Sequence, residues 1–74
     1  MLVKEYKYCG YTIEIHKNEI YHDFEYVIKD ENQEVKFASI HPYDEEDDVM
    51  KGAELKVHEL EEKVIDTMKK IIKN

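Results

Sequence analysis

The sequence predicts a single α+β domain over residues 1–74, with a three- or four-stranded antiparallel meander covered by one long C-terminal amphipathic helix. In the first part of the chain, apolar and polar residues alternate in several short segments, which is typical of half-buried strands. From residue 44 onward the apolar residues recur at spacings of three and four, the period of a helix with one apolar face. We therefore expect the sheet over about residues 2–40 and the helix over about residues 44–72.

Three segments have the alternation and the length of ordinary strands, namely residues 11–16, 24–29 and 35–40. Residues 6–8 also favour a strand, but their tyrosines fall on even positions, whereas the apolar residues of the following strand fall on odd ones. Cys9-Gly10 is therefore expected to be a bulge or bend that resets the alternation. Whether the first strand continues through Gly10 stays open, and with it the number of strands.

Short polar segments between the strands predict a meander. Residues 30–33 suit a hairpin turn, in which Asn32 is able to accept a left-handed conformation. Residues 17–19 give a weaker turn signal between the two preceding strands. Because neighbouring strands joined by short links pair antiparallel, we expect one apolar and one polar face, and the apolar face needs a cover.

The C-terminal segment has the signals of a helix that provides this cover. Pro42 disfavours helix before it, Asp44 is a suitable N-cap, and the acidic run of residues 44–48 suits the positive end of the helix dipole. Gly52 weakens the first third of the helix by about 1 kcal/mol relative to alanine, which leaves open whether regular helix begins only after it. The apolar face contains Met50, Ala53, Val57, Leu60, Val64 and Ile71.

The predicted helix is longer than the predicted sheet. At 1.5 Å per residue it spans roughly 43 Å, against roughly 23 Å for a seven-residue strand. Part of its apolar face should therefore lie uncovered, and exposed apolar area of this kind usually marks an interface. We expect a homodimer whose interface is formed by Val57, Leu60, Val64, Ile65, Met68, Ile71 and Ile72.

Composition narrows the classes of partner and compartment. Eighteen acidic and eleven basic residues give a formal net charge of −7, which disfavours direct nucleic-acid binding because the chain would repel a phosphate backbone. Cys9 is the only cysteine, so no intrachain disulfide can form and a reducing, cytoplasmic setting is expected. Residues 1–8 do not resemble a signal peptide and no apolar run approaches membrane-spanning length, so no membrane partner is expected.

No residue pattern identifies catalytic machinery. Cys9 and Ser39 are the single cysteine and serine, and neither has a recognisable base or nucleophile-elbow motif beside it. Three histidines could meet Asp23 across strand ends as metal ligands, but no pair has the tight spacing of a metal site. These are His16, His22 and His41. We expect no enzyme activity, no cofactor and no metal site.

Four of the six tyrosines are not required by the predicted core, namely Tyr6, Tyr8, Tyr21 and Tyr43. Tyrosine is enriched in protein interfaces, so these side chains could form a surface for a protein partner. Tyrosine is also well suited to strands, where it packs against residues of the neighbouring strand. Both interpretations stay open.

The sequence resembles short uncharacterised prokaryotic proteins of βββα build, through Tyr-x-Tyr-x-Gly-Tyr-Thr-Ile-Glu-Ile at residues 6–15 and His-Pro-Tyr-Asp-Glu-Glu at residues 41–46. In architecture it is also similar to the small sheet-plus-helix domain of HicB-like antitoxins. We interpret the chain as a small non-enzymatic protein-interaction module that self-associates. The alternative is an acidic antitoxin-like or nucleic-acid-mimic regulator that binds a basic partner.

Overall fold

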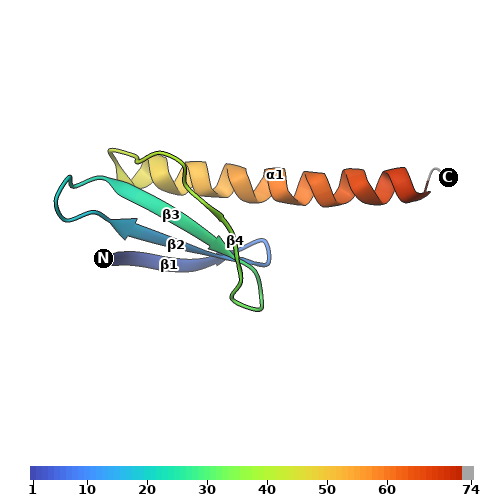
Figure 1. Ribbon diagram of the computed structural model, residues 1–74, viewed down its shortest axis with the longest axis horizontal. Coiled ribbons are helices and arrows are strands. Elements are labelled where there is room, and N and C mark those ends of the chain that lie inside the picture. The colour runs from blue at the N-terminus through green and yellow to red at the C-terminus, as the bar shows by residue number, and fades with distance from the viewer. Residues whose placement is uncertain (73–74) are drawn as a thin grey trace.

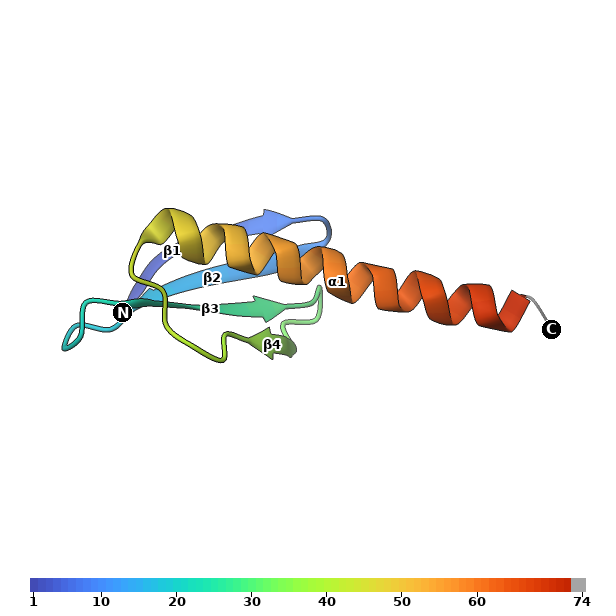
Figure 2. The ribbon, with the colours of Figure 1, turned by 90° about the horizontal axis from the view of Figure 1, so that it is seen from above.

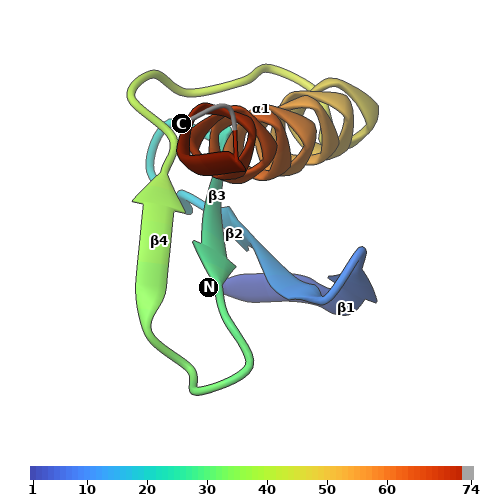
Figure 3. The same ribbon diagram turned by 90° about the vertical axis from the view of Figure 1, so that its right-hand side faces the viewer.

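The computed structural model describes the backbone of residues 1–72 and the side chains of residues 1–62. Within these residues it shows the predicted α+β fold, a four-stranded antiparallel sheet in the order β1-β2-β3-β4 followed by one helix (Figure 1). The elements are β1 (Leu2–Tyr8), β2 (Tyr11–Lys17), β3 (Phe24–Lys29), β4 (Val35–Ala38) and α1 (Glu46–Ile72). Viewed from one end, the helix covers one face of the sheet (Figure 3).

A tight turn at Cys9-Gly10 joins β1 to β2, which answers the question the sequence left open: the first strand does not continue through Gly10. Cys9 and Gly10 have φ angles of 50° and 85°, which is the left-handed pair that a two-residue hairpin turn of type I′ requires. The turn pairs Tyr8 with Tyr11 and Tyr6 with Ile13. Even positions of β1 therefore share a face with odd positions of β2, which explains the change of alternation at this point.

An aspartate closes the turn between β3 and β4. One carboxylate oxygen of Asp30 accepts hydrogen bonds from the backbone N–H of Asn32, at 2.8 Å, and of Glu34, at 3.0 Å. The left-handed residue of this turn is Gln33, with φ of 66°, although asparagine at position 32 could also accept that conformation. The N–H of Gln33 donates to the Asp30 carbonyl at 3.0 Å, so residues 30–33 form the turn and Gln33 is its last residue.

The connection between β2 and β3 is the longer loop of residues 18–23, where the sequence contains only a weak turn signal. The side-chain oxygen of Asn18 accepts hydrogen bonds from the N–H of Ile20, at 2.9 Å, and of Tyr21, at 3.1 Å. His22 takes a left-handed φ of 58° and donates its N–H to the Asn18 carbonyl at 2.8 Å. One asparagine thus organises the loop.

The chain that leads from β4 to α1 stays attached to β3. Strand β4 ends at Ala38, two residues before the predicted end at residue 40. The hydroxyl of Ser39 accepts a hydrogen bond from the Tyr26 N–H at 3.1 Å. Phe24 and Tyr43 exchange two backbone hydrogen bonds of 2.8 Å each, which form an isolated bridge. These bonds hold residues 39–43 against β3 up to the start of the helix.

Helix α1 begins at Glu46, two residues after the predicted N-cap position. The N–H of Val49 donates to the carbonyl of Glu45 at 3.1 Å, so Glu45, and not Asp44, precedes the first helical residue. The start is delayed because Tyr43 is still paired with β3. The acidic run does enter the first turn of the helix, as predicted.

The core lies between the helix and the face of the sheet formed by the alternating apolar residues. Its buried members are Ile13, Ile15, Tyr26, Ile28, Val49, Ala53 and Val57. The isoleucine and valine side chains among them contribute about 1.5–3 kcal/mol each when fully buried. The predicted alternation of β2 and β3 and the predicted helical spacing therefore identify the two surfaces that pack together.

Candidate interaction surface

Helix α1 lies along the sheet in its first half and projects past the ends of the strands in its second half (Figures 1 and 2). Val49, Ala53 and Val57 are fully buried against the sheet. The side chain of His58 is hydrogen bonded to Tyr8, at the end of β1. We call residues 63–72 the overhang, and at 1.5 Å per residue it extends the helix by about 15 Å.

The predicted interface divides into two parts. Val57 is 0% exposed and belongs to the core of the protomer, and Leu60 is half-buried and packs against that core. The sheet therefore covers Val57 completely and Leu60 in part. Five predicted members lie outside the residues whose side chains the structure describes, namely Val64, Ile65, Met68, Ile71 and Ile72.

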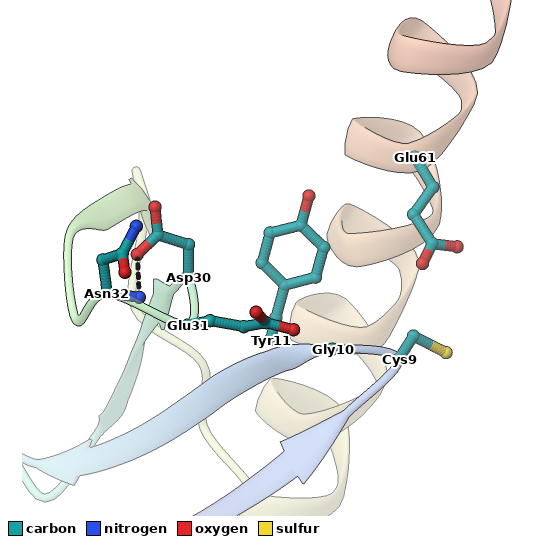
Figure 4. Close-up of a pocket in the computed structure, with 7 residues that line it drawn as sticks. All are labelled: Cys9, Gly10, Tyr11, Asp30, Glu31, Asn32 and Glu61. Atoms are coloured by element: carbon teal, nitrogen blue, oxygen red, sulfur yellow. Dashed lines mark hydrogen bonds between the residues drawn. The ribbon is translucent and has the colours of Figure 1, made fainter.

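A hollow of about 650 Å³ lies at the base of the overhang (Figure 4). Two hairpin turns that are distant in sequence form its floor and one wall, and helix α1 forms the opposite wall. In Figure 4 the ring of Tyr11 stands between the β3–β4 turn and Glu61 of the helix. The residues that line the hollow are Cys9, Gly10, Tyr11, Asp30, Glu31, Asn32 and Glu61.

The electrostatic character of the hollow is acidic. Asp30, Glu31 and Glu61 bring three carboxylates to its lining. Hydrogen bonds from the backbone of Glu34 and Asn32, with the ammonium of Lys36 3.4 Å away, hold the pKa of Asp30 below its ordinary value, although partial burial opposes this. Asp30 therefore stays ionised and also has a structural role, whereas Glu31 is exposed on the rim.

Two tyrosines of β1 form a polar contact with the helix, which we call the tyrosine ladder. The Tyr6 hydroxyl donates to Glu54 at 2.9 Å, and the Tyr8 oxygen lies 2.8 Å from Nε2 of His58. Two residues of strand and four residues of helix both advance by about 6–7 Å, so successive rungs stay aligned. Burial, with the hydrogen bond to Glu54 adding to it, raises the pKa of Tyr6 well above its usual range.

The tyrosine ladder was not predicted from the sequence. Tyr6, Tyr8 and Tyr43 pack against the core, which favours the packing interpretation for these three, whereas Tyr21 is 75% exposed. The signal that could have revealed the ladder is the match between tyrosines two apart in a strand and polar residues four apart in a helix. That match becomes meaningful only once β1 is known to lie beside α1.

A narrow aromatic groove of about 230 Å³ lies on the other side of the helix, beside β4. The ring of Tyr26 lies 6.2 Å from that of Phe37 and 6.1 Å from that of Tyr43, and the ring of His41 packs on that of Tyr43 at 4.7 Å.

Regular helix continues through Gly52, which answers the question the sequence left open. A Cβ at Gly52 would lie 2.5 Å from the Tyr43 oxygen, so glycine admits the ring.

The histidines considered as metal ligands do not converge. Nε2 of His16 donates a hydrogen bond to the Glu14 carboxylate at 2.9 Å, on the polar face of the sheet, while His41 packs on an aromatic ring. His22 lies in the β2–β3 loop. Within residues 1–62, whose side chains are described, no group of three histidine, cysteine, aspartate or glutamate side chains is placed to hold a metal ion.

Neither of the candidate nucleophiles is set in a catalytic arrangement. The Cys9 thiol is exposed at a turn, and the Ser39 hydroxyl accepts the bond from Tyr26 that anchors the chain beyond β4.

In the part of the chain that the structure describes, no helix is long and apolar enough to span a membrane. Scans of protein-family models, curated proteins and solved structures gave no match to this chain.

Proposed function

We propose that this protein is a small, non-enzymatic, cytoplasmic interaction module that pairs with a second copy of itself through the overhang of helix α1. The observation that carries the proposal is the length of the helix, which runs past the strands that cover its apolar face (Figure 2). Within the described residues, no strand lies beneath the overhang (Figures 1 and 2). The exposed thiol of Cys9 is consistent with a reducing compartment.

The pattern of the sequence supports an apolar partner for the overhang. The stripe buried by the sheet passes through Val49, Ala53 and Val57. The same helical spacing continues in the sequence to Val64 and Ile71. Apolar area left in water costs about 25 cal/mol per Å², so a stripe that continues beyond the sheet favours association.

A second copy is the simplest partner for such a stripe. A ten-residue helical extension is marginal in water by itself, because tertiary packing supplies most helical stability. Two identical stripes that pack on each other form a closed, two-fold symmetric interface, which ends assembly at the dimer. Self-association also compensates for the small core that a chain of 74 residues can build.

The experiment replaces two residues of the stripe by glutamate. The double variant Val64→Glu, Ile71→Glu should be a folded monomer, since a buried, unpaired carboxylate in each position opposes pairing of the helices. Light scattering coupled to gel filtration measures the mass, and far-ultraviolet circular dichroism checks the fold.

Leu55→Glu is the matched control. Leu55 lies on the same helix but is 67% exposed in the half that the sheet covers. This variant should keep the mass of the unaltered protein. A dimer that persists in Val64→Glu, Ile71→Glu would refute the overhang as the interface.

A further inference from the structure

We infer, building on the proposed self-association, that the two helices pair antiparallel and that the C-terminal end of each helix lies in the hollow of the other copy. The hollow is open at the base of the overhang, beside Glu61 of helix α1 (Figure 4). The occupant is thus the last helical turn of a second copy, around Lys69 and Lys70. Each dimer would contain two such contacts, related by the two-fold axis.

Length and position support this arrangement. Each overhang has the same length, so an antiparallel pair places the tip of one helix at the base of the other. A parallel pair would place the two hollows side by side and leave both unfilled. One turn of helix, 5.4 Å long and about 10 Å across, occupies roughly 420 Å³. The hollow, at about 650 Å³, has room for such a turn.

Charge distinguishes the two orientations more strongly. Glu31 and Glu61 line the hollow beside Asp30, whose carboxylate is paired with Lys36, whereas the sequence has lysines at 69 and 70 near the tip of the helix. An antiparallel pair brings these opposite charges together at both ends. A parallel pair would bring lysine toward lysine at the tips and carboxylate toward carboxylate at the base. Like charges so placed oppose pairing.

Cys9 provides a reporter of the orientation, because it is the only cysteine and is exposed in the lining of the hollow. In the variant Ile72→Cys, the introduced thiol should lie near Cys9 of the other copy. Mild oxidation should convert most of the protein to a covalent dimer on a non-reducing gel. Within one chain the helix tip lies too far from Cys9, since a disulfide requires Cα atoms less than about 7 Å apart.

Two controls show whether the cross-link joins the helix tip to Cys9 of the other copy. The double variant Cys9→Ser, Ile72→Cys should lose the covalent dimer, because the two helix tips lie at opposite ends of an antiparallel pair. Persistence of the cross-link in this variant would show tip against tip and would overturn the inference. The unaltered protein should not cross-link through Cys9 alone.

Sedimentation under reducing conditions separates this inference from the proposed function. A non-covalent dimer that gives no Cys9-dependent cross-link would overturn the docking in the hollow while self-association stands. A monomer at every concentration would overturn both.

Charge reversal tests the same contact without cysteine chemistry. The variants Glu31→Lys, Glu61→Lys and Lys69→Glu, Lys70→Glu should each dimerise at least about tenfold more weakly, because every contact becomes repulsive. An equimolar mixture of the two variants should form a heterodimer with the affinity of the unaltered protein. A mixture that stays as weak as its components would contradict the contact.

Discussion

At the scale of single residues, Gly52 is a helical position where contact with a neighbouring side chain, and not helix propensity, explains the residue type. Glycine in a helix costs about 1 kcal/mol relative to alanine, so propensity alone favours replacement. The Tyr43 ring, however, occupies the space that a Cβ would need, with its oxygen 2.5 Å and its Cζ 2.8 Å from that point. An added Cβ would therefore require the Tyr43 ring to shift.

The substitution Gly52→Ala should therefore destabilise the protein although it improves the helix. We expect the free energy of unfolding to fall by about 1–2 kcal/mol, because the Tyr43 ring is displaced. In the background Tyr43→Ala the same substitution should instead stabilise by about 1 kcal/mol. Urea unfolding of the four proteins measures this change of sign. Equal effects in both backgrounds would show that the ring does not depend on Gly52.

Glu14 connects stability to pH on the polar face of the sheet. Its carboxylate accepts hydrogen bonds from Lys29, at 2.8 Å, and from His16, at 2.9 Å, and these hold the pKa of Glu14 below its ordinary value. A carboxyl with a lower pKa in the folded state stabilises the fold above the unfolded-state pKa. That contribution declines as the pH falls through the folded-state pKa.

We expect the melting temperature to decrease as the pH is lowered below about 4.5, in part through Glu14. In Glu14→Gln the melting temperature should be lower at pH 7 and should decrease less steeply in acid. Glu19→Gln, in the exposed β2–β3 loop, is the control and should keep the profile of the unaltered protein. Identical profiles for Glu14→Gln and the control would exclude this contribution. Differential scanning fluorimetry between pH 3 and 7 provides the measurement.

At the scale of elements, the β1–β2 turn has a favourable glycine and an unfavourable cysteine. Both residues have positive φ, a region that glycine and asparagine enter more readily than other residues. Cys9→Asn should raise the free energy of unfolding by about 0.5–1 kcal/mol. Gly10→Ala should lower it by about 1 kcal/mol through backbone strain alone, since no atom lies within 4 Å of an added Cβ. Stabilisation by Gly10→Ala would contradict the turn.

The same turn shows how far elements could be predicted from the sequence. The strands at residues 11–16 and 24–29 and the helix followed from their periods alone, because half-buried elements must repeat apolar residues at 2.0 or 3.6. Whether Cys9-Gly10 is a bulge or a turn stayed open because cysteine carries no preference for positive φ. The register that requires it comes from the packing of Tyr6 and Tyr8 beside the helix. The delayed helix start likewise depends on a tertiary bridge to β3.

At the scale of the whole molecule, the sheet and the helix differ in length, and this mismatch was predictable from the two rises per residue. The hollow was not predictable. It joins the turn at residues 9–10, the turn at residues 30–32 and Glu61, which come together only through the order of the strands and the direction of the helix. Sequence reasoning thus anticipated an uncovered helix but not the acidic surface at its base.

The most direct test of the central claim is the mass of the unaltered protein in solution. Sedimentation equilibrium over a hundredfold range of concentration, with a reducing agent present, should give twice the mass of one chain at the upper end and a single reversible monomer–dimer equilibrium throughout. Higher salt should weaken the dimer without abolishing it, because the lysine–carboxylate contacts are screened while the apolar stripe is not. The mass of a single chain at every concentration would contradict self-association through the overhang.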